Sequence, residues 1–336
     1  MKFSFDEKHL FYRELAKLSA ARFPLPEALG AISDTNPPAA TRSVIGGVKS
    51  RLAEGKTIGE AFTDLPEAKL TDLEEAIVTA SERGGLLEEG FDHLADYFSM
   101  RDQTAKTIRR KMRYPLFLLH FVIIVAGIAL VVGAEDKMQA LTLSIGSLLV
   151  AYLVLFIAVV VGRHLAAKAE TDTGADKLLA RIPLIGAVRQ NLALARFSTV
   201  FRMHLLAGER IDEGLRSAAN ASQSARLIEA IEKGAIPTVN EGQPVGPALA
   251  KHPEVFTSTF ARGFSTAENS GTLDSDLQRW SQRFHDEARE AMGKLGTHAP
   301  KYFYAFVVVI ALWQILRLVM LIFGIYAKHF ELLDEI

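Results

Sequence analysis

The sequence predicts an all-α membrane protein that has two homologous cytoplasmic helical-bundle domains and three transmembrane helices. Three observations support this fold class: three apolar stretches are long enough to cross a bilayer, a pattern of residues recurs at a constant distance, and no run of alternating apolar and polar residues predicts a strand. The mean hydropathy of +0.16 lies between the values typical of soluble proteins and of transporters. We therefore expect soluble domains on a small membrane anchor.

The first two apolar stretches, 115–134 and 141–162, predict a membrane hairpin. A helix rises about 1.5 Å per residue, so each stretch can cross a hydrocarbon core about 30 Å thick. Backbone groups without hydrogen-bond partners are costly in lipid, so a helical hairpin is the expected form. The polar residues 135–140 between the stretches are too few for a domain and are expected to form a turn on the far side.

The third apolar stretch, 302–326, contains the intramembrane polar residues Gln314 and Arg317. These two residues lie three positions apart and therefore share one face of the helix. A charge near the middle of a bilayer is costly and usually has a function. The alternative interpretation is that Arg317, slightly beyond the midpoint, extends its guanidinium to the outer surface.

Basic residues beside the first stretch predict the orientation of the chain. The stretch is preceded by one acidic residue, Asp102, and by a cluster of basic residues: Arg101, Lys106, Arg109, Arg110, Lys111 and Arg113. Positive residues favour the cytoplasmic side, so both helical domains are expected in the cytoplasm, with 135–140 and the acidic tail outside. The juxtamembrane basic residues should also attract anionic lipid. Residues 1–13 contain no apolar core, so no cleavable signal peptide is expected.

Two helices frame the first soluble segment. Residues 10–21 have an amphipathic pattern, and a second helix is expected over 86–110. The apolar residues of the second helix predict a stripe that faces the core: Leu87, Phe91, Leu94 and Phe98. We expect this helix to continue with little break into the first membrane stretch, with Pro115 at a point where a kink is tolerated.

The pattern of the first segment returns after the hairpin at a constant distance of 186 residues. The first matched pairs are Phe11 with Phe197, Leu15 with Phe201, Ala21 with Ala207, Leu25 with Ile211, Glu27 with Glu213 and Leu29 with Leu215. The distance is one residue longer for Gly55-x-x-Ile58-Gly59-x-Ala61 with Gly242-x-x-Val245-Gly246-x-Ala248, and for Pro66 with Pro253. The distance of 186 then resumes for Glu82 with Glu268, Gly85 with Gly271, Leu87 with Leu273, Phe91 with Leu277, Leu94 with Trp280 and Phe98 with Phe284. A series of this length and order indicates two homologous helical domains of roughly 100 residues each.

The repeat and the apolar stretches together divide the chain into five parts. They are a first cytoplasmic domain at 1–113, a transmembrane hairpin at 114–162, a linker and second cytoplasmic domain at 163–301, a third transmembrane helix at 302–326 and a periplasmic tail at 327–336. Because the number of spans is odd, the two ends of the chain are expected on opposite sides of the membrane.

The composition and the motifs predict no enzyme. The chain has no cysteine, which removes thiolate nucleophiles and zinc–cysteine sites, and its net charge of −1 provides no basic footprint for nucleic acid. Gly55-Lys56-Thr57 imitates the end of a phosphate-binding loop, but Ser50 stands where that loop requires glycine. The nine histidines form no His-Glu-x-x-His motif. No catalytic, cofactor-binding or metal-binding residue is therefore expected.

The order of helical domain, hairpin, repeated domain and final span resembles the inner-membrane platform proteins of type IV pilus and type II secretion machines, the GspF/PilC-like family. The resemblance covers nearly the whole chain. The motifs that carry it are the openings of the two domains at 11–29 and 197–215, the lead Ile182-Pro183-x-x-Gly186, and a Glu-x-x-Gly-x-Leu motif that occurs as Glu82, Gly85, Leu87 and as Glu268, Gly271, Leu273. The first helix is expected within ten residues of Met1, whereas many members have an extension there, so the chain looks more like the shorter platforms of type IVb pili.

The resemblance implies a non-enzymatic scaffold that couples a cytoplasmic hexameric assembly ATPase to the extraction and polymerisation of pilins. The implied partners are that ATPase, pilins, other inner-membrane assembly proteins, membrane lipid and further copies of the chain in a homo-oligomer, with no cofactor and no nucleic acid. The implied location is the bacterial inner membrane, with the N-terminus in the cytoplasm and the C-terminus in the periplasm.

Three other functions compete with this one. A type II secretion platform is the nearest alternative, because the same family serves both machines. An oligomeric small transporter or channel is less favoured, since the spans carry few polar residues apart from His120, Gln314 and Arg317. A membrane protease or transferase lacks a visible pair of nucleophile and base.

The repeated motif and the basic cluster each have two interpretations. Glu82 and Glu268 could contact a partner, or could satisfy the N–H groups of the next helix or pair with an internal arginine; their presence in both copies favours the structural role. Gly85 and Gly271 are expected to form a left-handed or tight turn. The residues Arg109, Arg110, Lys111 and Arg113 are first a topology signal, and a contact with the ATPase through them is a further hypothesis.

Overall fold

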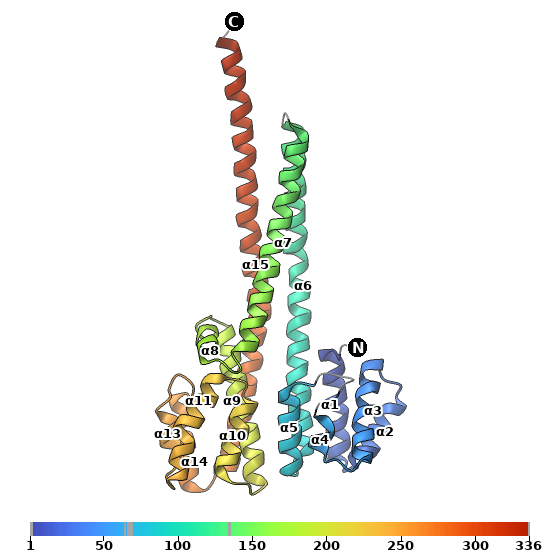
Figure 1. Ribbon diagram of the computed structural model, residues 1–336, viewed down its shortest axis with the longest axis vertical. Coiled ribbons are helices and arrows are strands. Elements are labelled where there is room, and N and C mark those ends of the chain that lie inside the picture. Colours follow the sequence, from blue (N-terminus) through green and yellow to red (C-terminus); the bar gives the residue numbers. More distant parts are fainter. Residues whose placement is uncertain (1–2, 64, 66–69, 134–135, 335–336) are drawn as a thin grey trace. The chain divides into compact units, whose positions relative to one another are not determined.

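The computed structural model describes residues 3–63, 65, 70–133 and 136–334, and every regular element within them is a helix (Figure 1). The chain forms two compact units. The first consists of Met1–Gln103 and Leu165–Gly293, and the second consists of Thr104–His164 and Lys294–Ile336. Both copies of the sequence repeat fall mainly in the first unit, and all three predicted membrane stretches fall in the second. The all-α class is confirmed.

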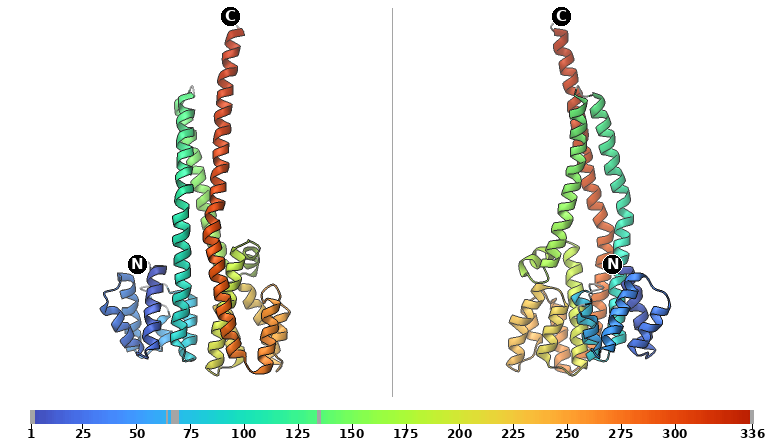
Figure 2. Two further views of the ribbon diagram at one scale, coloured as in Figure 1. Left: turned by 180° about the vertical axis from the view of Figure 1, so that it is seen from behind. Right: turned by 45° about the vertical axis from the view of Figure 1, so that its right-hand side comes forward.

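The first repeat begins with three helices that lie side by side in all the views (Figures 1 and 2). They are α1 (Phe5–Ala20), α2 (Leu25–Asp34) and α3 (Ala39–Ala53). The short α4 (Ile58–Phe62) and α5 (Asp72–Arg83) follow, and the repeat ends in the first turns of the long α6 (Leu87–Gly133). The predicted match of Pro66 with Pro253 lies outside the described residues.

Side-chain caps determine where several of these helices begin. Ser4 accepts a hydrogen bond from the N–H of Glu7 while the Glu7 carboxylate accepts one from the N–H of Ser4, which is a capping box. The first helix therefore begins at Phe5, five residues before the start at residue 10 that the amphipathic pattern predicted. Thr57 and Thr71 form the same arrangement at the starts of α4 and α5.

The second repeat has the same order of helices, preceded by one extra helix. The extra helix is α8 (Thr173–Ala180), and it is followed by α9 (Ile185–Leu206), α10 (Ile211–Ala221), α11 (Ala225–Ala230), η1 (Ile231–Ala235), α12 (Ile236–Asn240), α13 (Gly246–Ala250), α14 (Ser258–Ser270) and the start of α15 (Leu273–Asp334). By position, α9 and α10 correspond to α1 and α2, and α13 and α14 correspond to α4 and α5.

The single helix α3 corresponds to three consecutive elements in the second repeat, and this explains why the distance between the repeats changes by one residue. The elements α11, η1 and α12 run from Ala225 to Asn240, one residue longer than α3. The extra residue is held in a π-helical turn, in which the N–H of Ile236 donates to the C=O of Ile231, five residues back. Pro237 follows directly; it has no N–H to donate to the helix, so the irregular turn lies where the normal ladder would be broken in any case.

The core of the first unit follows the predicted stripe. Phe91, Leu94 and Phe98 of α6 are fully buried, while Leu87 at the start of the stripe is half-buried against the same core. Their counterparts in α15 behave alike: Leu277 and Phe284 are buried, and Leu273 and Trp280 are half-buried. Phe11 and Leu15 from α1 complete this face in the first repeat.

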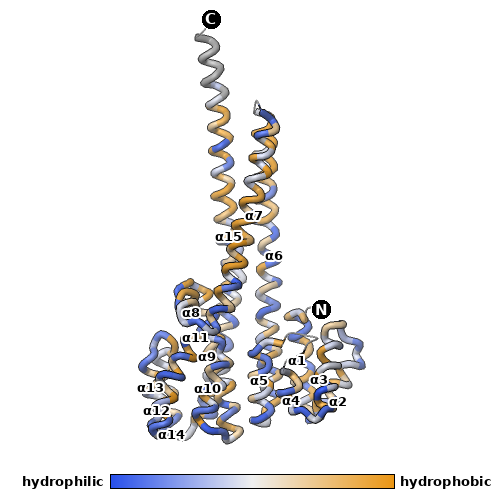
Figure 3. Tube along the Cα trace, in the orientation of Figure 1, coloured by the Kyte–Doolittle hydropathy of each residue, from blue (hydrophilic) through white to orange (hydrophobic). Residues whose placement is uncertain are grey.

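Three helices in the described residues are long and apolar enough to cross a membrane: α6, α7 (Lys137–Lys168) and α15. Figure 3 shows their apolar stretches in orange. The helix α6 is continuous for 47 residues and includes Pro115, as expected for the first span. The helix α15 is also continuous, for 62 residues, so the third stretch is joined to its repeat in the same way. The three predicted spans are confirmed by length and composition.

The turn of the hairpin is shorter than predicted. Asp136 Oδ1 accepts hydrogen bonds from the N–H groups of Met138 and Gln139, both at 3.0 Å, and so caps a helix that begins at Lys137. Lys137, Met138, Gln139 and Ala140 are therefore helical rather than part of the turn, and Glu135 lies outside the described residues. At the other end, α15 continues to Asp334.

Inside the second unit the spans pack through small and apolar residues. A Cβ at Gly127 of α6 would lie 3.2 Å from the Cβ of Ser144 in α7, so glycine permits a close approach of these helices. Leu119, Ile123 and Val307 form a buried apolar cluster between α6 and α15.

Candidate functional site

Glu82 binds the start of a helix that precedes it in the chain. Its carboxylate accepts hydrogen bonds from the N–H of Ile58 at 2.7 Å and from the N–H of Gly59 at 2.8 Å. These N–H groups open α4 and have no partner within that helix, and they form its positive end. The expectation that Glu82 accepts hydrogen bonds from the N–H groups of the next helix is wrong, since the N–H groups belong to the preceding helix. The reason is that α5 folds back along α4, which brings the last turn of α5 to the start of α4.

The second repeat contains the same clamp. Glu268 accepts from the N–H of Val245 at 2.7 Å and from the N–H of Gly246 at 2.8 Å, at the start of α13. The motifs Gly-x-x-Ile-Gly and Gly-x-x-Val-Gly therefore supply the donors, and the Glu-x-x-Gly-x-Leu motifs supply the acceptors. This geometry supports the structural interpretation of both glutamates.

Close packing explains the second glycine of each donor motif. A Cβ at Gly59 would lie 3.1 Å from the Cα of Thr79, and a Cβ at Gly246 would lie 2.6 Å from the Cα of Ser265. Only a residue without a side chain lets the short helix approach the long one closely enough for the clamp to form. The clamp and the glycine therefore depend on each other.

The glycine of each acceptor motif supplies the turn that was predicted. Gly85 and Gly271 have φ values of +67° and +70°, in the left-handed region that glycine adopts without strain. After this turn, Leu87 and Leu273 lie half-buried at the starts of α6 and α15. The motif thus ends one helix, turns the chain and begins the long helix.

The segment that imitates a phosphate-binding loop is a turn between two helices. Gly55 has a φ of +84° after the end of α3, and Thr57 is the N-cap of α4. The Thr57 hydroxyl accepts from the N–H of Glu60, so its position is explained by capping. In the described part of the chain, no group of three or more His, Cys, Asp or Glu side chains is placed to hold a metal ion.

A cavity of about 720 Å³ lies where the two repeats meet in the first unit. The first repeat lines it with α1 and α6, and the second lines it with the equivalent helices α9 and α15. Several lining residues are equivalents 186 positions apart: Arg13 and Thr199, Asp92 and Gln278, Asp96 and Gln282. The repeats therefore meet through the same face, as the subunits of a two-fold dimer do.

Asp96 is the acidic centre of this contact. In its own repeat it pairs with Arg13, which also pairs with Asp92. From the second repeat, Arg289 Nη2 lies 3.3 Å from Asp96 Oδ2, and His285 Nε2 lies 3.8 Å from the same oxygen. Partly exposed ion pairs contribute little individually to the free energy of unfolding. These pairs therefore determine how the two faces align more than they stabilise the contact between the repeats.

Two further contacts join the repeats on either side of this cluster. Arg202 Nη1 lies 2.5 Å from Glu89 Oε2, and the buried guanidinium of Arg196 lies 4.9 Å from the centre of the Tyr97 ring. A guanidinium over an aromatic face is attracted by the negative charge of the ring face. Both arginines belong to α9, and both of their partners belong to α6.

Two histidines from opposite repeats pack against each other in the same contact, with their ring planes tilted by 55°. The ring centres of His93 and His285 are 5.2 Å apart. Burial, followed by the nearby His285 and Arg196, lowers the pKa of His93 from 6.5 to about 3. Burial also lowers the pKa of His285, against the opposing effect of Asp96. Both imidazoles are therefore neutral near pH 7 and can pack without repulsion.

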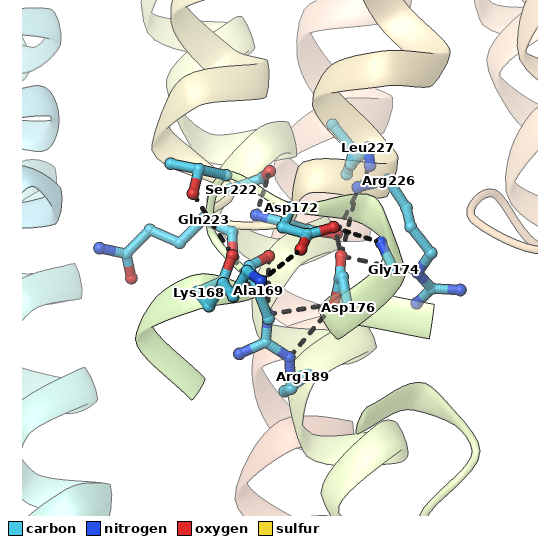
Figure 4. Close-up of polar contacts among 12 residues, drawn as sticks. Lys168, Ala169, Asp172, Gly174, Asp176, Arg189, Ser222, Gln223, Arg226 and Leu227 are labelled. Atoms are coloured by element: carbon cyan, nitrogen blue, oxygen red, sulfur yellow. Dashed lines mark hydrogen bonds and ion pairs between the residues drawn. The ribbon is translucent and has the colours of Figure 1, made fainter. Parts of the chain in front are cut away.

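A buried carboxylate in α8 fastens the residues after α7 to the second repeat (Figure 4). Asp176 is 1% exposed; its Oδ1 accepts from Arg189 Nη2 at 3.1 Å, and its Oδ2 accepts from Ser224 Oγ at 2.6 Å and from the N–H of Arg226 at 3.2 Å. Arg189 Nη2 also donates to the C=O of Ala169 at 3.4 Å. A buried charge needs such partners, and here they come from two separate segments, α9 and the start of α11. Repeat matching could not signal this site, because α8 has no counterpart in the first repeat.

The juxtamembrane basic residues are exposed. Arg109, Arg110, Lys111 and Arg113 all lie on α6 with accessible side chains, and Lys111 Nζ donates to Thr297 Oγ1 of α15 at 3.1 Å. Exposure leaves them available to lipid headgroups or to a partner.

The intramembrane polar residues belong to one small network. Gln314 is buried and its Nε2 donates to Ser147 Oγ of α7 at 3.1 Å. Arg317 Nη1 lies 3.5 Å from Gln314 Oε1, and its guanidinium lies 5.7 Å from the centre of the Trp313 ring. The sequence indicated Gln314 and Arg317 but not Ser147, whose position in the second apolar stretch was the available signal. A second polar contact in the spans joins His120 Nε2 to Tyr152 OH at 2.6 Å.

The duplicated helical unit and three candidate spans define a class of polytopic membrane protein with an internal repeat, and known proteins of one family are similar to the chain. Residues 11–134 match the family profile of type II secretion system (T2SS), protein F. The chain is 26% identical to the type II secretion system protein F of Vibrio cholerae, over 80% of this chain and 70% of that protein. It is 25% identical to the type IV pilus assembly protein PilC of Thermus thermophilus, over 85% of this chain and 74% of the relative. PilC of Pseudomonas aeruginosa is 22% identical, over 86% and 81%. The chain is thus similar to the GspF/PilC family over most of its length.

Proposed function

We propose that the chain is the inner-membrane platform of a type IV pilus assembly machine. The family consists of platform proteins of type IV pilus or type II secretion machines, which are scaffolds and not enzymes. The observation that carries the proposal is the continuity of α6 and α15, each of which runs as one helix from the core of a repeat into an apolar stretch. Such helices suit a protein that transmits movement between a soluble partner and the membrane.

The proposed partners follow from this role. A cytoplasmic hexameric assembly ATPase acts on the repeats, and pilins and other inner-membrane assembly proteins meet the spans of a homo-oligomeric platform. The proposed domains are 1–113 and 163–301 on the cytoplasmic side, with the spans in the inner membrane. The exposed basic residues of α6 support this orientation, because positive residues favour the cytoplasmic side.

Reporter fusions test the orientation. Alkaline phosphatase is expected to be active when it is fused after Ile336 or beside Lys137, and inactive when it is fused beside Gly234. An active fusion beside Gly234 would contradict the proposed topology.

A flexible insertion tests transmission through α6. A Gly-Ser stretch inserted between Arg101 and Lys106 separates the buried stripe from the membrane part of the helix, so folding and membrane insertion are expected to persist while pilus assembly is lost. The matched control is the same stretch inserted after Asn36, in the exposed loop between α2 and α3, which is expected to leave assembly intact. Normal assembly with the α6 insertion would show that rigid transmission is not required.

Type II secretion is the second candidate, because relatives of both kinds match the chain. Deletion of the gene separates the two: loss of surface pili supports the first function, and loss of secreted enzymes with intact pili supports the second. ATP hydrolysis by the purified chain, abolished by Lys56→Ala, would contradict the scaffold role in either machine.

A further inference from the structure

The helix α8 exposes apolar and basic side chains next to each other. Leu178 is 50% exposed and Ile182, just beyond the end of the helix, is 39% exposed. Lys177 and Arg181 are exposed beside them. Spacings of one and four residues put these four side chains on one side of the segment, while Ala175, Asp176 and Leu179 are buried on the other.

The polar contacts of α8 explain why this face remains outward. Asp176 is held by Arg189, Ser224 and Arg226, so the buried side of α8 is fixed to the second repeat. If the helix rotated to bury Leu178, the Asp176 carboxylate would lose its hydrogen-bond and ion-pair partners, which is energetically costly. The exposure of this face is therefore fixed by the fold and does not result from local unfolding at the end of the helix.

The short connection along the chain limits how far α8 can lie from a membrane span. The apolar stretch of α7 ends at Gly162, and the same helix continues only to Lys168. Six helical residues cover about 9 Å, and α8 begins five residues later. The C=O of Ala169 accepts from the N–H of Ala225 at 3.2 Å, so the residue that follows α7 is bound to the start of α11.

The charges near this face are mainly positive. Of the acidic residues nearby, Asp172 pairs with Lys168 at 3.2 Å and Asp176 is buried among arginines. Glu229, whose charge interacts with Lys177, pairs with Lys233 at 2.5 Å. Burial raises the pKa of Glu170, which Asp72 raises further. The exposed basic residues that form none of the ion pairs named above are Arg163, Lys177 and Arg181, and the last two lie beside the apolar Leu178 and Ile182.

We propose that the exposed face of α8 lies in the interfacial layer of an anionic lipid bilayer, with Leu178 and Ile182 among the acyl chains and with Lys177 and Arg181 at the phosphates. An apolar face bordered by basic residues, tethered beside a span, is the arrangement that partitions into a membrane surface. The second repeat is then fixed to the membrane at a point independent of its two long helices. This inference does not depend on which machine the protein serves.

The absence of cysteine makes a direct test possible, because a single introduced thiol is the only one in the chain. Full-length Leu178→Cys and Ile182→Cys are labelled with a nitrobenzoxadiazole fluorophore and reconstituted in vesicles of phosphatidylcholine and phosphatidylglycerol. Spin-labelled lipid in the same vesicles quenches only fluorophores that contact the bilayer. The matched controls are Leu206→Cys and Ile211→Cys, which are similarly exposed at 44% and 46%. Leu206 is the last residue of α9 and Ile211 is the first residue of α10, so both are separated from α8 by the 22 residues of α9, a length of about 30 Å.

The inference expects quenching at residues 178 and 182 to exceed that at 206 and 211 by about twofold or more. Equal quenching at the four positions would overturn it. A shielded fluorophore at 178 that responds to protein density and not to spin-labelled lipid would also overturn it, in favour of a second copy of the chain.

A charge variant tests the anionic part. Lys177→Gln with Arg181→Gln is expected to reduce quenching at residue 178 in vesicles with phosphatidylglycerol and to leave it nearly unchanged in pure phosphatidylcholine. Unchanged quenching in both vesicles would overturn the role of anionic lipid. Circular dichroism and gel filtration of each variant establish that the fold is retained.

Discussion

At one equivalent position in their cores, the first repeat has a buried ion pair and the second repeat has mainly apolar side chains. In the first repeat Lys8 Nζ lies 2.5 Å from Glu74 Oε2, and Tyr12 OH donates to Glu74 Oε1 at 2.7 Å, with Lys8 and Glu74 only 4% and 0% exposed. The equivalent positions, 186 residues on, hold Leu194, Ser198 and Phe260, all buried. Thr71 and Thr257 cap the helices α5 and α14 at matching positions, which fixes this alignment.

This difference shows which polar groups the fold requires. The buried ion pair is replaced by apolar side chains in the second repeat, so the helical arrangement does not depend on it. Ser198 is the one polar residue among the three equivalents in the second repeat. Its hydroxyl is buried, and no hydrogen-bond partner for it is found among the described residues. The clamps of Glu82 and Glu268, in contrast, are kept with the same donors and nearly the same distances.

Breaking one half of the ion pair should give the largest loss of stability. Lys8→Leu leaves the Glu74 carboxylate buried with one partner fewer, and such a change costs about 3–5 kcal/mol. Chemical unfolding of the purified chain in detergent measures the free energy of unfolding. The triple variant Lys8→Leu, Tyr12→Ser and Glu74→Phe copies the second repeat and is expected to recover most of the loss.

The triple variant decides whether the comparison is valid. If it is as unstable as Lys8→Leu alone, the first repeat needs its ion pair and the two cores are not interchangeable. A conservative control, Tyr12→Phe, removes only the hydroxyl donor and is expected to cost about 1 kcal/mol.

The sequence predicted the features that repeat and missed those that occur once. The helical class, the buried Phe91 and Leu277 and the left-handed glycines follow from periodicity or from the distance of 186 residues, and the three spans follow from the length of their apolar stretches. The partners of Glu82 and Glu268 did not follow, because they depend on how α5 folds back against α4. The motif of the donors was nevertheless visible in the sequence at both positions.

Three-dimensional contacts without a local pattern account for the rest. Asp176 lies in a helix that only the second repeat has, and its partners are 13, 48 and 50 residues away. His93 and His285 are 192 residues apart and are not repeat equivalents. The start of α7 was misplaced because apolar content, and not the cap at Asp136, was used to place it.

Removing the clamp should cost less than breaking the ion pair, and it should cost the same in both repeats. Glu82→Ala and Glu268→Ala each leave two N–H groups at a helix start without an acceptor, which is expected to lower the free energy of unfolding by about 2–3 kcal/mol. Glu82→Gln and Glu268→Gln keep one acceptor oxygen and should lose about half as much. Thermal and chemical unfolding measure the four variants in parallel. A loss confined to one repeat would show that the motif has different roles in the two copies.

An effect smaller than that of breaking the ion pair concerns the contact between the repeats and appears only in acid. The pKa of His93 is about 3 in the folded chain and 6.5 in the unfolded chain, so below pH 6.5 the unfolded state binds a proton that the folded state does not. The contribution of neutral His93 is therefore fully present above pH 6.5 and is lost progressively as the pH falls toward 3. By linkage the loss at pH 5 is about 2 kcal/mol.

The variant His93→Gln cannot bind this proton. Between pH 7 and pH 5 its free energy of unfolding is therefore expected to fall by about 2 kcal/mol less than that of the wild type. The control His164→Gln, at an exposed position, should behave as the wild type. His285, whose pKa is also lowered, leaves a residual dependence in His93→Gln that the double variant with His285→Gln should remove. If His93→Gln and the wild type lose stability in parallel, the two packed histidines are not what makes the contact between the repeats sensitive to acid.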